Sequence, residues 1–146
     1  MKLLRKFLND KVSVYQATPC IDERGSLVPI DLSEIHFPTK RIFLVRASSN
    51  VERGGHGHYA GRQFLMPITG KITVELLYEG CMEIEQLSSP ENCLLIEAGV
   101  WSRQIYADET SALLVCCDTS YDESDYFYTK TQIVSAKTKA GPKGSL

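Results

Sequence analysis

Short apolar runs separated by turn residues follow one another along most of the chain. Residues 72–78 alternate, with Ile72, Val74 and Leu76 on one face and a threonine and a glutamate on the other. A repeat of two residues is that of a β-strand, and helical periodicity is nearly absent elsewhere. About eight to ten such runs predict an all-β protein in which antiparallel strands form a sandwich or barrel, with the two-sheet jelly roll as the leading architecture.

The alternation and the turns place the individual strands. We expect strands over residues 11–15, 27–30, 41–46, 63–68, 72–78, 82–87, 93–96, 102–106 and 111–117. The last run is apolar on both faces, which predicts a central strand. Residues 1–9 are expected to form a short helical lead-in with Leu4, Phe7 and Leu8 on one face, and residues 48–61 a long glycine-rich connection.

The length of 146 residues fits one domain with a hydrophobic core, which we place at residues 1–136, before a disordered tail at 137–146. Net charge is −2 and the basic residues are scattered, which argues against nucleic-acid and anionic-membrane partners. No segment has the pattern of a membrane span or signal peptide. The five cysteines form no C-x-x-C pair, so reduced, mostly buried thiols and a cytoplasmic location are expected.

Residues 53–65 combine four glycines, two arginines and two of the three histidines. In an extended backbone, His56 and His58 point to the same side. Two imidazoles that converge inside a barrel can hold a transition metal or transfer protons. A third interpretation is that both are structural residues bonded to the backbone.

The spacing from His56 and His58 to Gln63 and Gly70 resembles the first signature of the cupin superfamily, which implies a double-stranded β-helix, the cupin jelly roll. Metal-binding cupins carry glutamate where this chain offers Gln63, or Arg62 one residue earlier. At the place of the histidine in the second signature stands Ser102.

A metal site is disfavoured by this count of ligands. First-row divalent metals want three or four nitrogen, oxygen or sulfur ligands, and the pattern supplies two. His36 lies far from both signatures, and Arg62 beside the pair would repel a cation. The sequence therefore favours acid–base work with no metal and no cofactor. An imidazole can take a proton from a carbon next to a carbonyl, and Arg62 and Gln63 are suitable donors to the enediolate oxygen that develops.

Five motifs in the same order resemble one group of small cupins, the TDP-4-keto-6-deoxyglucose 3,4-ketoisomerases (the WxcM-like, RmlC-like group). They occupy residues 22–27, 37–42, 53–58, 99–101 and 121–126. The resemblance implies a homodimer, often with exchanged N-terminal strands, and a TDP-linked substrate. It implies an isomerase that moves a keto group from C4 to C3 of the hexose through an enediol. The product of such enzymes usually enters deoxysugar biosynthesis for surface polysaccharide such as lipopolysaccharide.

The resemblance also implies roles for particular residues. His58 matches the family's catalytic base and His56 its partner. The candidates for binding the substrate are Arg24, Arg41, Tyr59, Arg62, Gln63, Trp101 and Arg103. Guanidinium groups suit pyrophosphate and sugar oxygens, and aromatic rings stack on a base or sugar. Residues 121–126 are expected to be a lid or a strand-capping turn.

The chain departs from the family pattern at two places. Tyr59 stands where the family usually has lysine, and Phe43 and Leu44 stand where it usually has two tyrosines. Two other functions therefore stay open: a metal-dependent small-molecule cupin enzyme, and a non-catalytic module that binds a nucleotide sugar.

Overall fold

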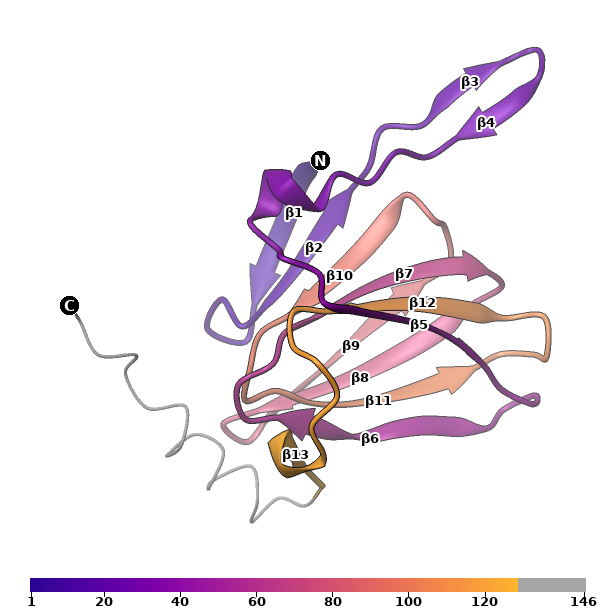
Figure 1. The fold of residues 1–146 in the computed structure, drawn as a ribbon. Helices are drawn as coiled ribbons and strands as arrows, with labels where there is room; N and C mark the ends of the chain where they lie inside the picture. Colours follow the sequence, from indigo (N-terminus) through magenta and orange to yellow (C-terminus); the bar gives the residue numbers. More distant parts are fainter. Residues whose placement is uncertain (129–146) are drawn as a thin grey trace.

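The computed structural model describes residues 1–128, in which two antiparallel sheets pack face to face (Figure 1). The six-stranded sheet has the order β1 (Lys2–Phe7), β2 (Val12–Gln16), β10 (Asn92–Ile96), β7 (Gln63–Thr69), β12 (Ala112–Cys117) and β5 (Arg41–Arg46). The five-stranded sheet has the order β13 (Tyr126–Phe127), β6 (Glu52–His58), β11 (Trp101–Tyr106), β8 (Ile72–Tyr78) and β9 (Cys81–Leu87). The predicted jelly roll is confirmed, and the predicted tail at 137–146 lies outside the described residues.

Two smaller pieces complete this architecture. The hairpin of β3 (Cys20–Asp22) and β4 (Gly25–Leu27) projects away from the two sheets in Figure 1. Short 3₁₀ helices, η1 (Leu32–Ile35) and η2 (Glu123–Asp125), precede β5 and β13. No helix within residues 1–128 combines the length and the apolar character that crossing a bilayer requires.

Most predicted strands are confirmed to within one residue at each end, and β12 lies inside its sheet, between β7 and β5. The expected helical lead-in is wrong, because residues 2–7 pair with β2 as the edge strand β1. The expected strand over 27–30 is shifted to β4 at Gly25–Leu27. All five cysteines are free, and three of them are buried.

The expected connection over 48–61 is also wrong, because its middle part, residues 52–58, is β6. Gly54 and Gly55 have φ of 81° and 73°, a conformation that favours glycine, and the register between β6 and β11 shifts at this point. The glycines therefore make a bulge inside a strand rather than a loop.

The core lies between the two sheets, where the inward side chains of both are buried. Leu65 on β7 is fully buried between Leu94 of β10 and Val115 of β12, its register partners. Across the core, Ile72, Val74 and Leu76 of β8 are also fully buried. The alternation along β8 therefore predicted its inward face correctly.

We expect Leu65→Ala to lower the free energy of unfolding by about 2–5 kcal/mol, because it leaves a cavity that close-packed strands cannot fill. Ile84→Ala on β9 is the matched control, since its side chain is 57% exposed. Its effect should stay within about 0.5 kcal/mol. Urea denaturation at one fixed protein concentration measures both, and equal losses would contradict the assigned core.

Candidate active site

Strand β6 carries both histidines of the site. The rings of His56 and His58 lie side by side, with centroids 5.4 Å apart and planes at 81°. Between them, Gly57 is buried under Phe127 of β13 and against the backbone oxygen of Val100. A side chain at this position would collide with both, so the glycine allows β13 to pair directly with β6.

His56 faces an interior cavity of about 90 Å³ between the sheets. The side chains of Phe43, Gln63 and Gln104 line the same cavity. Burial lowers the pKa of His56, and a hydrogen bond with the backbone of Gly54 partly offsets this. Gln63 and Gln104 are each 8% exposed, so two amides reach the interior next to the imidazole.

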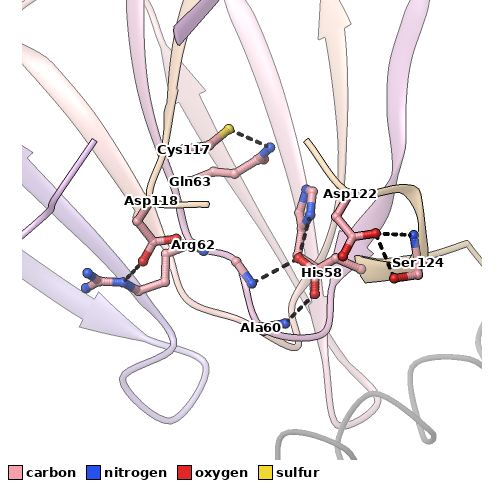
Figure 2. A network of polar contacts seen from close by, with 10 residues as sticks. His58, Ala60, Arg62, Gln63, Cys117, Asp118, Asp122 and Ser124 are labelled. Atoms are coloured by element: carbon pink, nitrogen blue, oxygen red, sulfur yellow. Dashed lines mark hydrogen bonds and ion pairs between the residues drawn. The ribbon is translucent and has the colours of Figure 1, made fainter. Parts of the chain in front are cut away.

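His58 is the more strongly perturbed of the two. Its side chain is 13% exposed, and its Nδ1 lies 3.4 Å from Oδ2 of Asp125 (Figure 2). Its Nε2 is buried and has no hydrogen-bond partner within residues 1–128. Burial lowers the pKa of His58 to about 4, with contributions from His56 and Arg41, and Asp125 opposes this shift. At neutral pH the imidazole is therefore uncharged, with one nitrogen able to accept a proton.

Aromatic rings cover the pair from the chain segment that follows β12. The ring of Tyr126 lies 4.8 Å from that of His56 and 4.5 Å from that of His58, between centroids. Tyr128 lies 6.0 Å from His56, and Tyr121 lies 5.9 Å from Tyr126. The segment expected to be a lid or a turn is thus η2 followed by an edge strand, and it forms one wall of the site.

Arg41 and Gln63, two of the residues predicted to bind substrate, lie near the histidines. The guanidinium carbon of Arg41 is 4.7 Å from the ring centroid of Phe43 and 4.9 Å from that of Tyr121. It is close enough to His58 to lower the pKa of that imidazole. Gln63 directs its amide nitrogen to Sγ of Cys117 at 3.8 Å.

Arg62 is not brought to the histidine pair. Its Nε donates to Asp118 at 2.7 Å, and one terminal nitrogen donates to the backbone oxygen of His36 at 3.1 Å. Figure 2 shows its guanidinium pointing away from His58. The reason is the period of two in β7, because inward Gln63 leaves its neighbour outside. The sequence-based role of Arg62 as a donor to the enediolate therefore has no support in this geometry.

Tyr59, Trp101 and Arg103 belong to the outer side of the five-stranded sheet. The ring of Tyr59 packs 5.3 Å from that of Phe127. Indole Nε1 of Trp101 donates to the backbone oxygen of Tyr128 at 3.3 Å. Arg103 donates to Glu75 at 2.5 Å and 2.8 Å. On β11, Trp101 and Arg103 alternate with buried side chains, so they face outward.

Arg24 lies on the projecting hairpin of β3 and β4, with its side chain 85% exposed and an ion pair of 2.5 Å to Asp22. In Figure 1 this hairpin projects away from β6, the strand that carries both histidines. A wider cavity of about 510 Å³ opens beside Asp125 and is lined in part by Lys40, Thr119 and Tyr121. Its volume is within the range of small-molecule pockets.

Within the described part of the chain, no group of three or more His, Cys, Asp or Glu side chains is placed to hold a metal ion. The geometry instead suits proton transfer: a buried, neutral imidazole with a free nitrogen, a neighbouring cation and two interior amides. Sequence reasoning missed Gln104, Asp125 and Tyr126 as residues of this site. The acidic and aromatic composition of residues 121–126 was the available signal for the last two.

Solved structures of sugar isomerases share this fold. QdtA, a sugar 3,4-ketoisomerase from Thermoanaerobacterium thermosaccharolyticum in complex with TDP, is 27% identical, with a TM-score of 0.82 over 88% of this chain and 96% of that chain. Its histidine-to-asparagine mutant is in complex with TDP-4-keto-6-deoxyglucose. A 3,4-ketoisomerase from Helicobacter canadensis is 25% identical, with a TM-score of 0.79 over 85% and 95% of the two chains.

A more distant likeness shows the fold alone. The RmlC epimerase of Mycobacterium tuberculosis is 14% identical, with a TM-score of 0.77 over 88% of this chain and 72% of that chain. A search of curated proteins gives no match. The family model described as "FdtA: WxcM-like, C-terminal" matches residues 10–138. Since that match covers most of the sequence, the chain belongs to the WxcM-like, C-terminal (FdtA) family.

Proposed function

We propose that the chain is a nucleotide-sugar 3,4-ketoisomerase that acts on a TDP-4-keto-6-deoxyhexose. The observation that carries this proposal is the free, buried Nε2 of the neutral His58, beside His56 and near Arg41. The likeness to QdtA, which is in complex with TDP or with TDP-4-keto-6-deoxyglucose, supports the substrate class.

The reaction needs no net oxidation. Nε2 of His58 takes the proton from C3, the electron pair of that bond forms the C3–C4 double bond, and the carbonyl oxygen at C4 gains a proton. The resulting enediol then loses the proton of its C3 hydroxyl, which becomes the new carbonyl. The same histidine or a bound water returns a proton to C4.

Three groups can stabilise the enediolate in this scheme. The charge of Arg41 acts near His58, and the amides of Gln63 and Gln104 face the cavity beside His56. The phenol of Tyr126, whose ring contacts both histidines, can relay protons between the two oxygens. It thereby takes the place of the tyrosines that the family usually carries at Phe43 and Leu44.

The proposed working form is a cytoplasmic homodimer that supplies surface-polysaccharide synthesis. The outer face of the six-stranded sheet supports the dimer, because Ile42 and Leu44 on its edge strand β5 are 60% and 52% exposed. Leu44 is in register with Leu114, and Leu114 with Met66, so the apolar row continues across three strands. A second copy of the chain is the occupant proposed for this face.

His58→Asn should lower kcat by about 10²–10⁴-fold with unchanged affinity for TDP, because the variant removes only the proton acceptor. His36→Asn is the matched control and should keep full activity, since His36 is exposed and its φ of 53° suits asparagine. Conversion of TDP-4-keto-6-deoxyglucose in deuterated water, followed by NMR, measures turnover and isotope incorporation.

The proposal fails if the wild-type protein gives neither a 3-keto product nor deuterium in the sugar. Binding of the TDP-sugar without turnover would identify a binding module instead. Stoichiometric iron, nickel or zinc whose removal abolishes turnover would identify a metal-dependent enzyme.

Folding stability should fall as pH drops from about 6.5 toward 4. In this window the unfolded chain protonates His58 at its ordinary pKa, whereas the folded chain, with its pKa lowered to about 4, does not. Protons therefore favour the unfolded state until the pH passes below the folded value. Unfolding free energies of the wild type and His58→Asn at several pH values test this, and identical slopes would contradict the buried neutral imidazole.

Exchange of N-terminal elements between subunits can be tested by complementation. Arg24→Ala should weaken TDP-sugar binding about 10–100-fold if the hairpin of one copy serves the site of the other, because it removes a charged hydrogen bond to the substrate. Dimers that combine one Arg24→Ala copy with one His58→Asn copy should regain activity, since one of their two sites is then intact. Glu23→Ala, on the same hairpin, is the control. Mixed dimers without activity would show that Arg24 does not act across the dimer.

A further inference from the structure

The side chain of Asp125 is held firmly at the end of η2. Its Oδ1 accepts a hydrogen bond from the backbone N–H of Ala60 at 2.8 Å, and its Oδ2 accepts one from Gly61 at 3.1 Å. Its own backbone oxygen accepts from the N–H of Tyr59 at 2.8 Å. The side chain is 14% exposed. Asp125 is therefore fixed against the loop that directly follows β6.

The same carboxylate faces the ring of His58. Oδ2 lies 3.4 Å from Nδ1, so the carboxylate bonds to the amides of the loop on one side and faces the imidazole on the other. An ionised carboxylate only accepts hydrogen bonds, so it favours the tautomer of neutral histidine that carries its proton on Nδ1. The lone pair then belongs to Nε2, which is the buried nitrogen without a partner within residues 1–128.

We propose that Asp125 is a positioning residue that acts through His58 by fixing the tautomer with the proton on Nδ1 and presenting an unprotonated Nε2 to the substrate. Its negative charge also stabilises the imidazolium that forms once Nε2 has taken a proton. The catalytic consequence rests on the proposed function, whereas the tautomer is a property of the protein without substrate.

The groups around His58 differ in whether they raise or lower its pKa. His56 on β6 and Arg41 on β5 both lower the pKa of His58, and the phenol of Tyr126 lies against the ring from β13. Asp125, from η2, is the group that raises it. Removing the charge of Asp125 therefore makes His58 a weaker base. It also removes the preference for the tautomer with its proton on Nδ1.

The test compares Asp125→Asn with Asp31→Asn as a matched control. Asp31, which precedes η1, also bonds to a backbone amide of a 3₁₀ helix, accepting from the N–H of Ser33 at 3.0 Å and from its hydroxyl at 2.5 Å. NMR of protein with ¹⁵N-labelled histidine reports the tautomer and the pKa of His58 directly. We expect the Nδ1–H tautomer in the wild type and in Asp31→Asn, and a loss of that tautomer with a lower pKa of His58 in Asp125→Asn.

Kinetics give a second readout. Asp125→Asn should lower kcat about 10–100-fold with little change in KM, as for other residues that orient a reactive ligand, and Asp31→Asn should retain kcat. The acid limb of the kcat/KM profile should move to lower pH in Asp125→Asn, which a purely structural effect would not cause.

The two arms separate this inference from the proposed function. If no variant turns over the TDP-sugar, the proposed function fails and the NMR result alone decides the role of Asp125. A wild-type His58 protonated on Nε2, or an Asp125→Asn variant with unchanged tautomer and pKa, overturns the inference. Should Asp125→Asn not fold, Asp125→Glu replaces it: the retained carboxylate should preserve the Nδ1–H tautomer, and the Nε2–H form would count against the role.

Discussion

The contact on which the site depends is the pairing of β13 with β6 at Gly57. Because Gly57 has no side chain, Phe127 fits directly over the strand between the two histidines. This pairing sets Tyr126 opposite His58 in register and places Asp125, one residue earlier, at the imidazole. Two side chains far along the chain from the histidine motif are thus brought to it by one glycine and one buried phenylalanine.

Burial then decides which chemistry the histidines can perform. An exposed imidazole near its ordinary pKa would be partly charged at neutral pH, whereas burial and the charges of His56 and Arg41 keep His58 neutral. A proton acceptor in an enclosed site also needs its conjugate acid stabilised, and Asp125 is the one group described beside His58 that raises its pKa. The arrangement therefore combines a weakly basic ring with a fixed negative partner, as reversible proton transfer at carbon requires.

Much of the fold was predictable from the sequence, because the strand alternation and the turns record which side chains are buried. Ile72, Val74 and Leu76, expected on one face of their strand, all point inward and are fully buried. The edge strand β1 was not predictable, since most of its side chains are exposed and its pattern resembles that of an amphipathic helix. Strand β6 was not predictable either. Its glycines form a bulge and a close contact in the structure, but such a glycine-rich sequence is typical of a loop.

The site shows the same division. His56 and His58 were found because one motif contains them, but the side to which their neighbours point depends on where each strand begins. Because β7 starts at Gln63, that amide points inward and Arg62 points outward to Asp118. A shift of one residue would reverse the two directions, and the composition does not determine this register. Asp125 is 67 residues from His58, and no local spacing rule connects them.

The charges of one chain explain why a second copy is part of the proposed enzyme. A pyrophosphate carries negative charge that needs cationic partners, and among the arginines predicted to bind substrate, Arg41 is the one that the fold brings near the histidines. Arg62 and Arg103 are each paired with carboxylates, and the hairpin of β3 and β4, which carries Arg24, projects away from the two sheets. The exposed apolar row of Ile42 and Leu44 lies on β5, the strand that also carries Arg41. A partner that covered this row would come close to Arg41, so a dimer there could both bury the apolar face and supply the missing positive charge.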